Sequence, residues 1–367
     1  MSPKQGGLIS LKYLTLWLLA WSKLKDNSQM TATNEQQDQP DVTQNAAEPI
    51  TKAAAPTWQQ PYLSTSTFSR LPFVAQPTAD EADIAIMGIP WDGLVTHRPG
   101  ARFGPREIRQ ASVACRSYSS HMDVSVYEQA RVVDVGDVDI ANFDYQETFA
   151  RIESKAFDLH SKGISLVSLG GDHSVLLPLL RAMFRQHGTF TLIQFDAHTD
   201  TSATEGTPQY HHGTCVRNAI EEGLIEGSGI FQIGIRGSFG SASYLDYGKQ
   251  NGINVLDMHD FHHRERRNAF VAKLRETAGT NPCYVTFDID GIDPAYAPGT
   301  GTPVPGGLTS FEAIDMLREL RGLRVLGGDV VEVAPAYDNH AQITSLLGAT
   351  LALQITALIA ICQQNDK

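Results

Sequence analysis

The fold of this chain is decided by the stretch Phe190-Thr191-Leu192-Ile193-Gln194-Phe195-Asp196-Ala197-His198-Thr199-Asp200. Its first six residues are mostly apolar or β-forming, and they predict a buried parallel strand. Alternate residues of an extended segment point the same way, so Asp196, His198 and Asp200 can project together. They follow the carboxyl end of the strand, where open α/β sheets bind their ligands. Unpaired carboxylates are costly to bury, and a divalent metal would relieve that cost.

Two other apolar runs also end in clusters of ligand-type residues. Residues 164–169 precede Gly170-Gly171-Asp172-His173-Ser174, and residues 284–287 precede Asp288-Ile289-Asp290-Gly291-Ile292-Asp293-Pro294. Asp288 and Asp290 are two positions apart, so both can face one point. Three neighbouring strand ends would then deliver six candidate ligands: His173, Asp196, His198, Asp200, Asp288 and Asp290.

Each cluster alone has an ordinary explanation as a strand-to-helix turn, a helix cap or a calcium-like loop. Their joint occurrence after three apolar runs predicts a metal site. The set holds four carboxylates, two imidazoles and no thiolate. Such ligands favour a pair of hard or borderline divalent ions, such as manganese, over structural zinc.

Composition limits the classes of protein to consider. The chain has 367 residues, of which 42% are hydrophobic and 19% charged, enough for a sizeable core. The formal net charge of -12 argues against a nucleic-acid partner, which usually needs a basic face. The four cysteines form no CxxC motif, which is typical of reduced thiols in a cytoplasmic protein.

Residues 1–57 differ from the rest of the chain. Residues 8–21 are apolar and aromatic, but no small-residue cleavage site follows Trp21, and the run is short for a membrane span. We expect a disordered or dispensable leader, with Met30 as an alternative start. An interfacial or partner-binding helix, or a signal or anchor, are the alternatives. Residues 58–367 should form a single domain with no membrane association.

Strand and helix patterns alternate along that domain. This alternation predicts an α/β fold whose mainly parallel sheet is covered by helices on both faces. Thr309 and Glu312 have the spacing of a capping box, which predicts a helix over residues 309–321. The expected strands are 84–89, 131–135, 164–169, 190–195, 231–235, 253–256, 284–287 and 325–333; the other expected helices begin near residues 105, 145, 176, 215, 264 and 343.

These motifs resemble the ureohydrolase (arginase/agmatinase) family, most closely its agmatinase-type members. The resemblance extends to Gly299-Thr300-Gly301-Thr302-Pro303 and Val331-Glu332-Val333-Ala334-Pro335, and it covers about residues 84–360. It implies a three-layer α/β/α fold around a central, mostly parallel eight-stranded sheet. It also implies two Mn²⁺ ions, hydrolysis of a guanidino compound to urea and an amine, and a homotrimer or homohexamer.

The resemblance also implies a ligand set for each ion. One ion would be bound by His173, Asp196, Asp200 and Asp288, and the other by Asp196, His198, Asp288 and Asp290. Two such ions can share one water and lower its pKa from about 15.7 toward neutrality, so that hydroxide attacks the guanidinium carbon. Nickel or another divalent metal is an alternative to manganese. Asp172, Ser174 and Asp293 are candidates to support the ligands.

Two further residues match catalytic positions of the family. Glu332 matches the carboxylate that binds the guanidinium, although a strand-end glutamate can instead pair with an arginine. His212 matches a histidine assigned to proton transfer or substrate contact, although it could be an ordinary loop residue. Gly301 and Thr302 would shape the pocket wall. Arg236 is typical of the family, and we expect a structural role for it.

Agmatine, giving putrescine, is the expected substrate because the His212-Gly213-Thr214 element looks more like agmatinases than arginases. His211 departs from agmatinase-type relatives, which often have an acidic residue there. A basic pocket mouth, using Arg98, Arg102 or His211, would instead suit a distal carboxylate. Guanidinobutyrate, guanidinopropionate and guanidine or its alkyl derivatives are therefore alternatives. Less favoured are a non-catalytic metal-binding relative and a zinc amidohydrolase of the deacetylase type.

Overall fold

The computed structural model describes residues 66–203, 208–239 and 242–365, all within the compact unit 50–367. The predicted leader, residues 1–57, lies outside the described residues. One sheet contains β1 (Ile84–Gly88), β4 (Val132–Asp137), β5 (Ser165–Leu169), β6 (Thr191–Phe195), β7 (Ile230–Ile233), β8 (Asn254–Leu256), β9 (Pro282–Asp288) and β10 (Arg324–Val331). All their pairings are parallel, in the order β4-β1-β5-β10-β9-β6-β7-β8. The predicted eight-stranded parallel sheet is confirmed.

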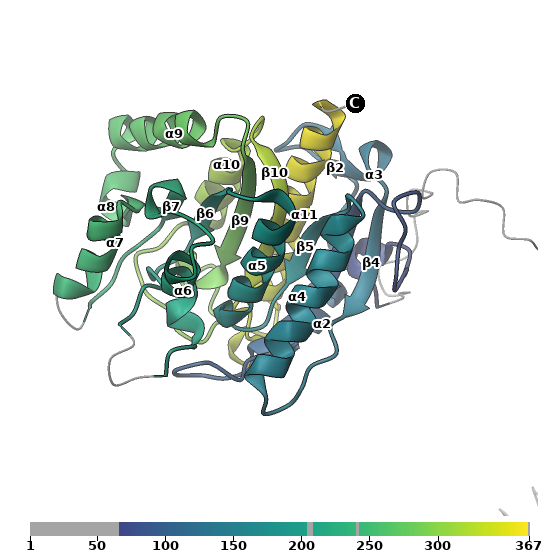
Figure 1. Cartoon of the computed structure of the whole chain (residues 1–367), viewed down its shortest axis with the longest axis horizontal. Coiled ribbons are helices and arrows are strands. Elements are labelled where there is room, and N and C mark those ends of the chain that lie inside the picture. Colours follow the sequence, from purple (N-terminus) through teal and green to yellow (C-terminus); the bar gives the residue numbers. More distant parts are fainter. Residues whose placement is uncertain (1–65, 204–207, 240–241, 366–367) are drawn as a thin grey trace, which may run out of the picture. The chain divides into compact units, whose positions relative to one another are not determined.

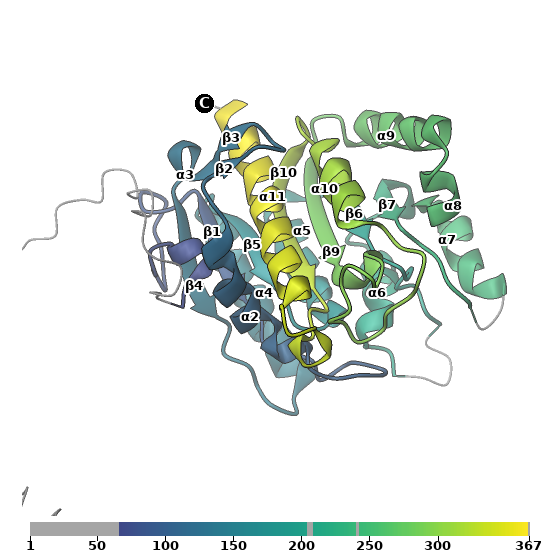
Figure 2. The same ribbon diagram turned by 180° about the vertical axis from the view of Figure 1, so that it is seen from behind.

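Helices cover both faces of this sheet. One face carries α4 (Tyr145–Ser161), α5 (Leu176–His187) and α6 (Cys215–Glu221), as Figure 1 shows. The opposite face carries α2 (Gly104–Ala111), α10 (Ser310–Arg318) and α11 (Ile343–Asn365), seen in front of the sheet in Figure 2. The predicted three-layer α/β/α arrangement is therefore present.

The remaining elements are short, apart from α9. They comprise α3 (Val126–Gln129), α7 (Asp246–Asn251), α8 (Met258–Phe261), α9 (Arg264–Ala278) and a small antiparallel pair, β2 (Tyr118–Ser119) with β3 (Val124–Ser125). The 3₁₀ turns are η1 (Phe68–Arg70), η2 (Ala101–Phe103), η3 (Ser112–Ala114), η4 (His173–Val175), η5 (His212–Thr214), η6 (Gly227–Gly229), η7 (Ala242–Leu245), η8 (Ile289–Gly291) and η9 (Pro335–Tyr337).

The alternation of side chains along each strand produces two separate cores. In β1, Ile84 and Ile86 join the core beneath α11, whereas Ala85 and Met87 join the core beneath α4 and α5. Both sets are fully buried. A strand covered on both faces needs apolar residues at every position, which is why the runs found in the sequence are continuous.

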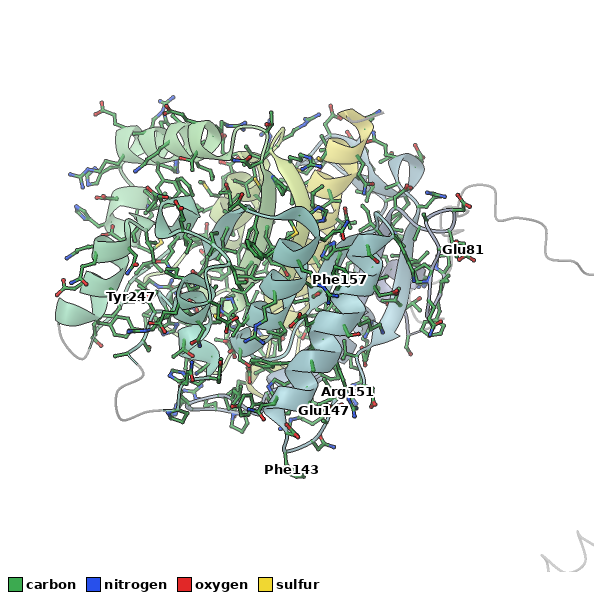
Figure 3. The ribbon with its side chains drawn as sticks, viewed as in Figure 1. Glu81, Phe143, Glu147, Arg151, Phe157 and Tyr247 are labelled. Carbon is green, nitrogen blue, oxygen red and sulfur yellow. The ribbon has the colours of Figure 1, made fainter. Side chains whose placement is uncertain are left out.

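Polar residues mark the outer side of α4. Arg151 forms an ion pair with Glu147 one turn earlier, and both side chains are labelled on that helix in Figure 3. The inner side of the same helix carries Phe149 and Ile152, which are buried against the sheet. This two-sided pattern is what fixes a surface helix onto a sheet.

The last helix, α11, is mostly apolar. Its segment Ile343–Gln364 is long and apolar enough to cross a membrane, but 83% of its most apolar window is buried inside the fold. It packs on β10 and α2 and fills the core of its layer. The helix therefore has the burial expected of a core helix.

Three local expectations differ from the structure. The strand ends carrying the three motifs are not all immediate neighbours, because β10 lies between β5 and β9. Helix α10 ends at Arg318, three residues earlier than predicted, although its capping box at Thr309 and Glu312 is confirmed. The hairpin β2–β3 and helices α3, α7 and α8 were not predicted, because segments of two to six residues are too short to show a hydrophobic period.

Candidate metal centre and active site

The six predicted metal ligands come together at one edge of the sheet. His173 begins η4 after β5, residues 196–200 follow β6, Asp288 ends β9, and Asp290 lies in η8. Because the strands are parallel, all these carboxyl ends lie at the same edge. The six predicted ligands therefore lie together, and the end of β10 lies between the ends of β5 and β9.

The imidazole of His173 is buried, and its Nδ1 atom faces three carboxylates. This nitrogen lies 2.7 Å from Oδ2 of Asp200, 3.2 Å from Oδ2 of Asp196 and 3.4 Å from Oδ2 of Asp288. Nδ1 nevertheless has no hydrogen-bond partner within the described parts of the chain. Buried polar atoms in folded proteins almost always have a partner. A nitrogen that binds a metal ion needs no hydrogen-bond partner of its own, and carboxylate oxygens around it can bind the same ion. These residues therefore fit a bound cation.

His198 occupies the corresponding place on the other side of Asp196. Its Nδ1 atom lies 3.1 Å from Oδ2 of Asp290 and 3.5 Å from Oδ1 of Asp196. Backbone and hydroxyl donors hold the acids: the N–H of His198 donates to Asp196 (2.6 Å) and the Thr302 hydroxyl to Asp290 (3.1 Å). Asp196 thus faces both histidines, as a bridging ligand must.

The carboxylates strongly perturb one another. Burial and the negative charges of Asp290 and Asp196 raise the pKa of Asp288 well above its usual value. Burial and the charge of Asp196 likewise raise the pKa of Asp200. Burial opposes the charge of Asp196 too, but its interactions with the neighbouring imidazoles of His173 and His198 lower its pKa. Repulsion among crowded acids is the electrostatic condition that a divalent cation relieves.

Among the residues that the structure describes, three sets of ligand atoms lie close enough to hold an ion: His173, Asp196 and Asp288; Asp196, His198 and Asp290; and His173, Asp200 and Cys215. The first two overlap with the two predicted ligand sets and share Asp196. The third includes a cysteine that sequence reasoning missed. The Cys215 thiol donates to Oδ2 of Asp200 at 3.3 Å. The feature of the sequence that could have indicated Cys215 is its position directly after His212-Gly213-Thr214.

Glu332 follows β10 and lies beside this centre. Its Oε1 atom accepts the backbone N–H of His173 (2.8 Å) and lies 2.9 Å from Nδ1 of His212. Its Oε2 atom is buried and has no hydrogen-bond partner among residues 66–203, 208–239 and 242–365. The residue has a φ of 62°, a left-handed conformation that is uncommon outside glycine. Such strain is found mainly where the surrounding structure fixes a functional side chain.

His212 connects Glu332 to the loop that follows β1. The Thr96 backbone N–H donates to Nε2 of His212 at 3.0 Å, so Nε2 offers its lone pair and Nδ1 carries the proton that Glu332 accepts. The Thr96 hydroxyl also lies 2.6 Å from Nε2. Burial opposes a charge on His212, but the hydrogen bond to Glu332 raises its pKa to about 9. The backbone N–H of Thr96 acts in the opposite direction and favours the neutral imidazole, because a second proton on Nε2 would point at this N–H group.

A cavity of about 190 Å³ opens onto these residues. It is lined by Thr96, His173, His198, Asp200, Ser202, His211, His212, Gly213, Tyr244, Asp288 and Thr302. His211 is thus at the cavity, as the sequence indicated, but the two arginines proposed for its mouth are engaged elsewhere. Arg102 pairs with buried Asp92, and Arg98 stacks on Tyr337 with its guanidinium carbon 5.3 Å from the ring centroid.

Two of the three predicted supporting residues lie against the centre. Asp172 accepts from the backbone and hydroxyl of Ser174, which fixes the turn that presents His173, and it also accepts from the N–H of Leu94 at 3.0 Å. Asp293 is different: its carboxylate accepts N–H groups of Ala295, Gly306 and Gly307 and organises that loop. These bonds join the turn after η8 to the segment at Gly306 and Gly307, so Asp293 organises the loop rather than supporting a ligand.

Arg236 has the structural role expected of it. Its guanidinium donates to backbone carbonyls of Asp290 (2.7 Å), Gly291 (3.1 Å) and Val304 (2.6 Å). These bonds tie the turn after β9 to the segment next to Thr302. Burial lowers the pKa of Arg236.

Two buried glutamines also hold the centre and were not predicted. Gln194 of β6 donates to Oδ2 of Asp196 at 2.8 Å, and Gln232 of β7 donates to Oε1 of Gln194 at 2.8 Å. The available signal was an amide inside each apolar strand, since such a group is buried only where it has hydrogen-bond partners.

Comparisons with known proteins agree with this geometry. The arginase family model matches residues 82–357. A guanidinopropionase of Pseudomonas aeruginosa is 42% identical over 295 residues, which are 80% of this chain and 91% of that protein. An agmatinase of Salmonella paratyphi B is 44% identical over 290 residues, 78% of this chain and 91% of that protein.

A solved structure shows the same fold. Proclavaminate amidino hydrolase from Streptomyces clavuligerus superimposes with a TM-score of 0.77 and 37% sequence identity. The match covers 83% of this chain and all of that one. The family model, the close relatives and the shared fold lead to one conclusion: the chain belongs to the arginase family.

Proposed function

We propose that this protein hydrolyses a guanidino compound to urea and an amine at a centre of two divalent metal ions. The observation that carries the proposal is the unpartnered Oε2 of Glu332 beside two overlapping sets of metal-ligand atoms. A buried carboxylate oxygen without a donor would accept the N–H groups of a guanidinium. The ligand sets would supply a metal-activated water to the same site.

The ligand assignment follows the two overlapping sets. His173, Asp196, Asp200 and Asp288 would hold one ion, and Asp196, His198, Asp288 and Asp290 the other. Oxygen and imidazole ligands suit Mn²⁺, and Ni²⁺ is the alternative that such ligands also accept. When bound, the ions would lower the pKa of a shared water and supply the nucleophile.

The protein's own residues would bind and orient the substrate. Glu332 would pair with the guanidinium and fix its carbon relative to the centre, since its Oε1 is already held by His212 and His173. His212 would hold Glu332 in this orientation through its Nδ1–H hydrogen bond, and only the doubly protonated ring would have a proton to give to the departing amine. Gly301 leaves space beside Glu332, because a Cβ added there would lie 3.7 Å from Oε2.

Agmatine is the first substrate to test, because several relatives at 43% to 44% identity are named agmatinases. Guanidinopropionate and guanidinobutyrate come next, since relatives at 42% and 39% identity are named for them. In either case, the neutral hydrogen-bonding groups at the cavity, such as Ser202 and Tyr244, would contact the part of the substrate beyond the guanidine.

A second candidate is guanidine itself or a short alkylguanidine. The cavity volume of about 190 Å³ is below the roughly 300–1,000 Å³ typical of pockets for larger ligands. Thr96 contributes to this small volume because the loop after β1 reaches His212. A cavity of this size suits small guanidino compounds, and guanidine is the smallest of them to test.

The test is urea release from a panel of guanidino compounds by protein loaded with Mn²⁺ or with Ni²⁺. The proposal expects urea from at least one compound, and the preferred chain length identifies the substrate. Metal-loaded protein that releases no urea from any of them would contradict it. We further propose a homotrimer or homohexamer in the cytoplasm; the four cysteines form no CxxC motif, which agrees with that compartment, and light scattering tests the assembly.

A further inference from the structure

We propose that Thr286 and Asp329 are positioning residues that fix the tautomer of His173 and so prepare its Nδ1 atom for a metal ion. The inference rests on the proposed metal centre, because it concerns how this protein prepares one of the ligands. Neither residue belongs to the ligand motifs. Both are fully buried in neighbouring strands, Thr286 in β9 and Asp329 in β10.

The three side chains form one hydrogen-bonded chain. The Thr286 hydroxyl donates its only hydrogen to Oδ1 of Asp329 at 2.7 Å. The hydroxyl oxygen can therefore only accept from Nε2 of His173, which lies 2.8 Å away. This order places the imidazole proton on Nε2. The remaining nitrogen, Nδ1, then presents its lone pair to Asp196, Asp200 and Asp288.

Tyr284 of β9 keeps the far end of this hydrogen-bonded chain in place. The Tyr284 hydroxyl donates to Oδ2 of Asp329 at 2.8 Å, so both carboxylate oxygens have a donor. Tyr284 reaches that position because Gly327 has no side chain: a Cβ there would lie 3.0 Å from the tyrosine ring. A carboxylate with both oxygens engaged cannot turn away from Thr286.

This arrangement explains the unpartnered nitrogen of His173. Metal-binding histidines usually donate their other ring N–H to a carboxylate, a carbonyl or water, which fixes ring orientation and raises basicity. Here a threonine hydroxyl is interposed between the imidazole and the carboxylate. The insertion of β10 between β5 and β9 is what brings Asp329 within reach.

The test compares Thr286→Val, which removes the hydroxyl but keeps the shape, with Thr286→Ser, which keeps the hydroxyl. We expect Thr286→Val to weaken divalent-metal affinity by about 10- to 100-fold, measured by competition of Mn²⁺ with a chelating dye. Thr286→Ser should stay within about threefold of the unmodified protein. Asp329→Asn, which changes the far end of the chain, should also weaken binding.

A spectroscopic measurement separates positioning from a merely structural role. The Zn²⁺-loaded protein should show a downfield imidazole N–H proton signal, protected from exchange by the bond from Nε2 of His173 to Thr286. The signal should persist in Thr286→Ser and disappear in Thr286→Val. Thr356→Val is the matched control, because it removes a buried hydroxyl in α11 that bonds only the carbonyl of Ala352 (2.7 Å).

The outcomes distinguish this inference from the proposed function. Equal metal affinity in Thr286→Val and the unmodified protein, or equal losses in Thr286→Ser and Thr286→Val, would overturn the positioning role alone. A loss of affinity in the Thr356→Val control as large as that in Thr286→Val would do the same. An unmodified protein that binds no divalent metal would overturn both the inference and the proposed function.

Discussion

Glu332 shows how one residue's surroundings decide its chemistry. One carboxylate oxygen is held by His212 and by the backbone of His173, while the other is buried and free. Asp293 is also a carboxylate after a strand, but its oxygens are occupied by backbone N–H groups. The free oxygen, rather than the residue type, distinguishes a substrate-binding carboxylate from a structural one.

Replacement of Glu332 by glutamine tests this difference. The amide keeps the shape of the side chain but loses the charge that would pair with a guanidinium. We expect kcat/KM for urea release to fall by roughly a hundredfold, because charge-assisted hydrogen bonds contribute about 1.5–3 kcal/mol each. Metal content should be unchanged. Activity within threefold of the unmodified protein would show that Glu332 does not bind the substrate.

Gly301 lies beside Glu332, so a side chain at this position should interfere with substrate binding. A Cβ at this position would lie 2.8 Å from the Arg98 carbonyl and 3.7 Å from Oε2 of Glu332. Gly301→Ala should therefore lower kcat/KM at least tenfold and destabilise the fold by about 1–3 kcal/mol, as overpacking does. Gly248→Ala in α7 is the control, since a Cβ there would lie 3.7 Å from the side chain of Ile253, an ordinary van der Waals contact. Equal activity of the two variants would refute the role of Gly301.

At the scale of secondary-structure elements, a buried ion pair joins helix α2 to strand β4. Arg109 donates to both oxygens of Asp134, at 2.8 and 3.0 Å, and both side chains are buried. The Phe68 N–H also donates to Asp134. The pair therefore holds the segment around Phe68, helix α2 and the edge strand β4 together.

Removal of one partner of this pair should strongly destabilise the protein. Asp134→Ala leaves the buried Arg109 charge with only the half-exposed Asp137 as a partner and removes the acceptor of the Phe68 N–H, so we expect a loss of about 3 kcal/mol in the free energy of unfolding. Asp139→Ala breaks the exposed pair with Arg151 and should cost about 1 kcal/mol or less. Chemical denaturation measures both. Similar losses in the two variants would contradict the importance of burial.

His160 on the inner side of α4 makes stability depend on pH. Burial and the neighbouring His187 lower its pKa to about 3 in the folded state. The unfolded chain, with an imidazole pKa of about 6.5, binds a proton that the folded protein does not, so stability falls as pH drops below about 6.5. Between pH 6.5 and 5 the loss should be about 2 kcal/mol.

The variant His160→Gln removes this titration. Its free energy of unfolding should fall less steeply with acidification than that of the unmodified protein over the same interval. The difference between the two slopes isolates His160 from the other acid-sensitive groups. Identical slopes would show that the folded protein tolerates a charge at this position.

At the scale of the whole molecule, the carboxylates gathered at the sheet edge oppose folding until a cation neutralises them. Asp196, Asp200, Asp288 and Asp290 come from two different strands, so the folded state alone brings their charges together. Binding of a metal to the folded protein should therefore also be visible as stability of the entire domain.

Removal of metal should lower the melting temperature. At a metal concentration of 100 times Kd, each independent site adds about 2.7 kcal/mol to the free energy of unfolding, and chelation removes it. Asp288→Asn should lose most of this increment, and its metal-free form should be more stable than the metal-free unmodified protein, because one repelled charge is gone. Calorimetry with and without chelator measures both effects. A melting temperature insensitive to chelation would argue against a metal centre in the folded protein.

The sequence determined which segments become strands and which residue types follow them. A buried parallel strand needs a continuous apolar run, and the alternation of side chains is local, so the sites of His173, Asp196, His198, Asp288 and Asp290 were predictable. Glu332 and His212 could be found only through resemblance to a family, because a lone glutamate or histidine has many ordinary roles.

The tertiary structure alone decided which strands lie side by side. The order of parallel strands depends on crossovers through helices and on packing between distant segments, and no local period encodes it. For this reason the insertion of β10 between β5 and β9 was not predicted, nor were the contacts that depend on it. The link from Asp329 through Thr286 to His173, and the contact of Cys215 with Asp200, exist only because residues distant in the sequence meet at one sheet edge.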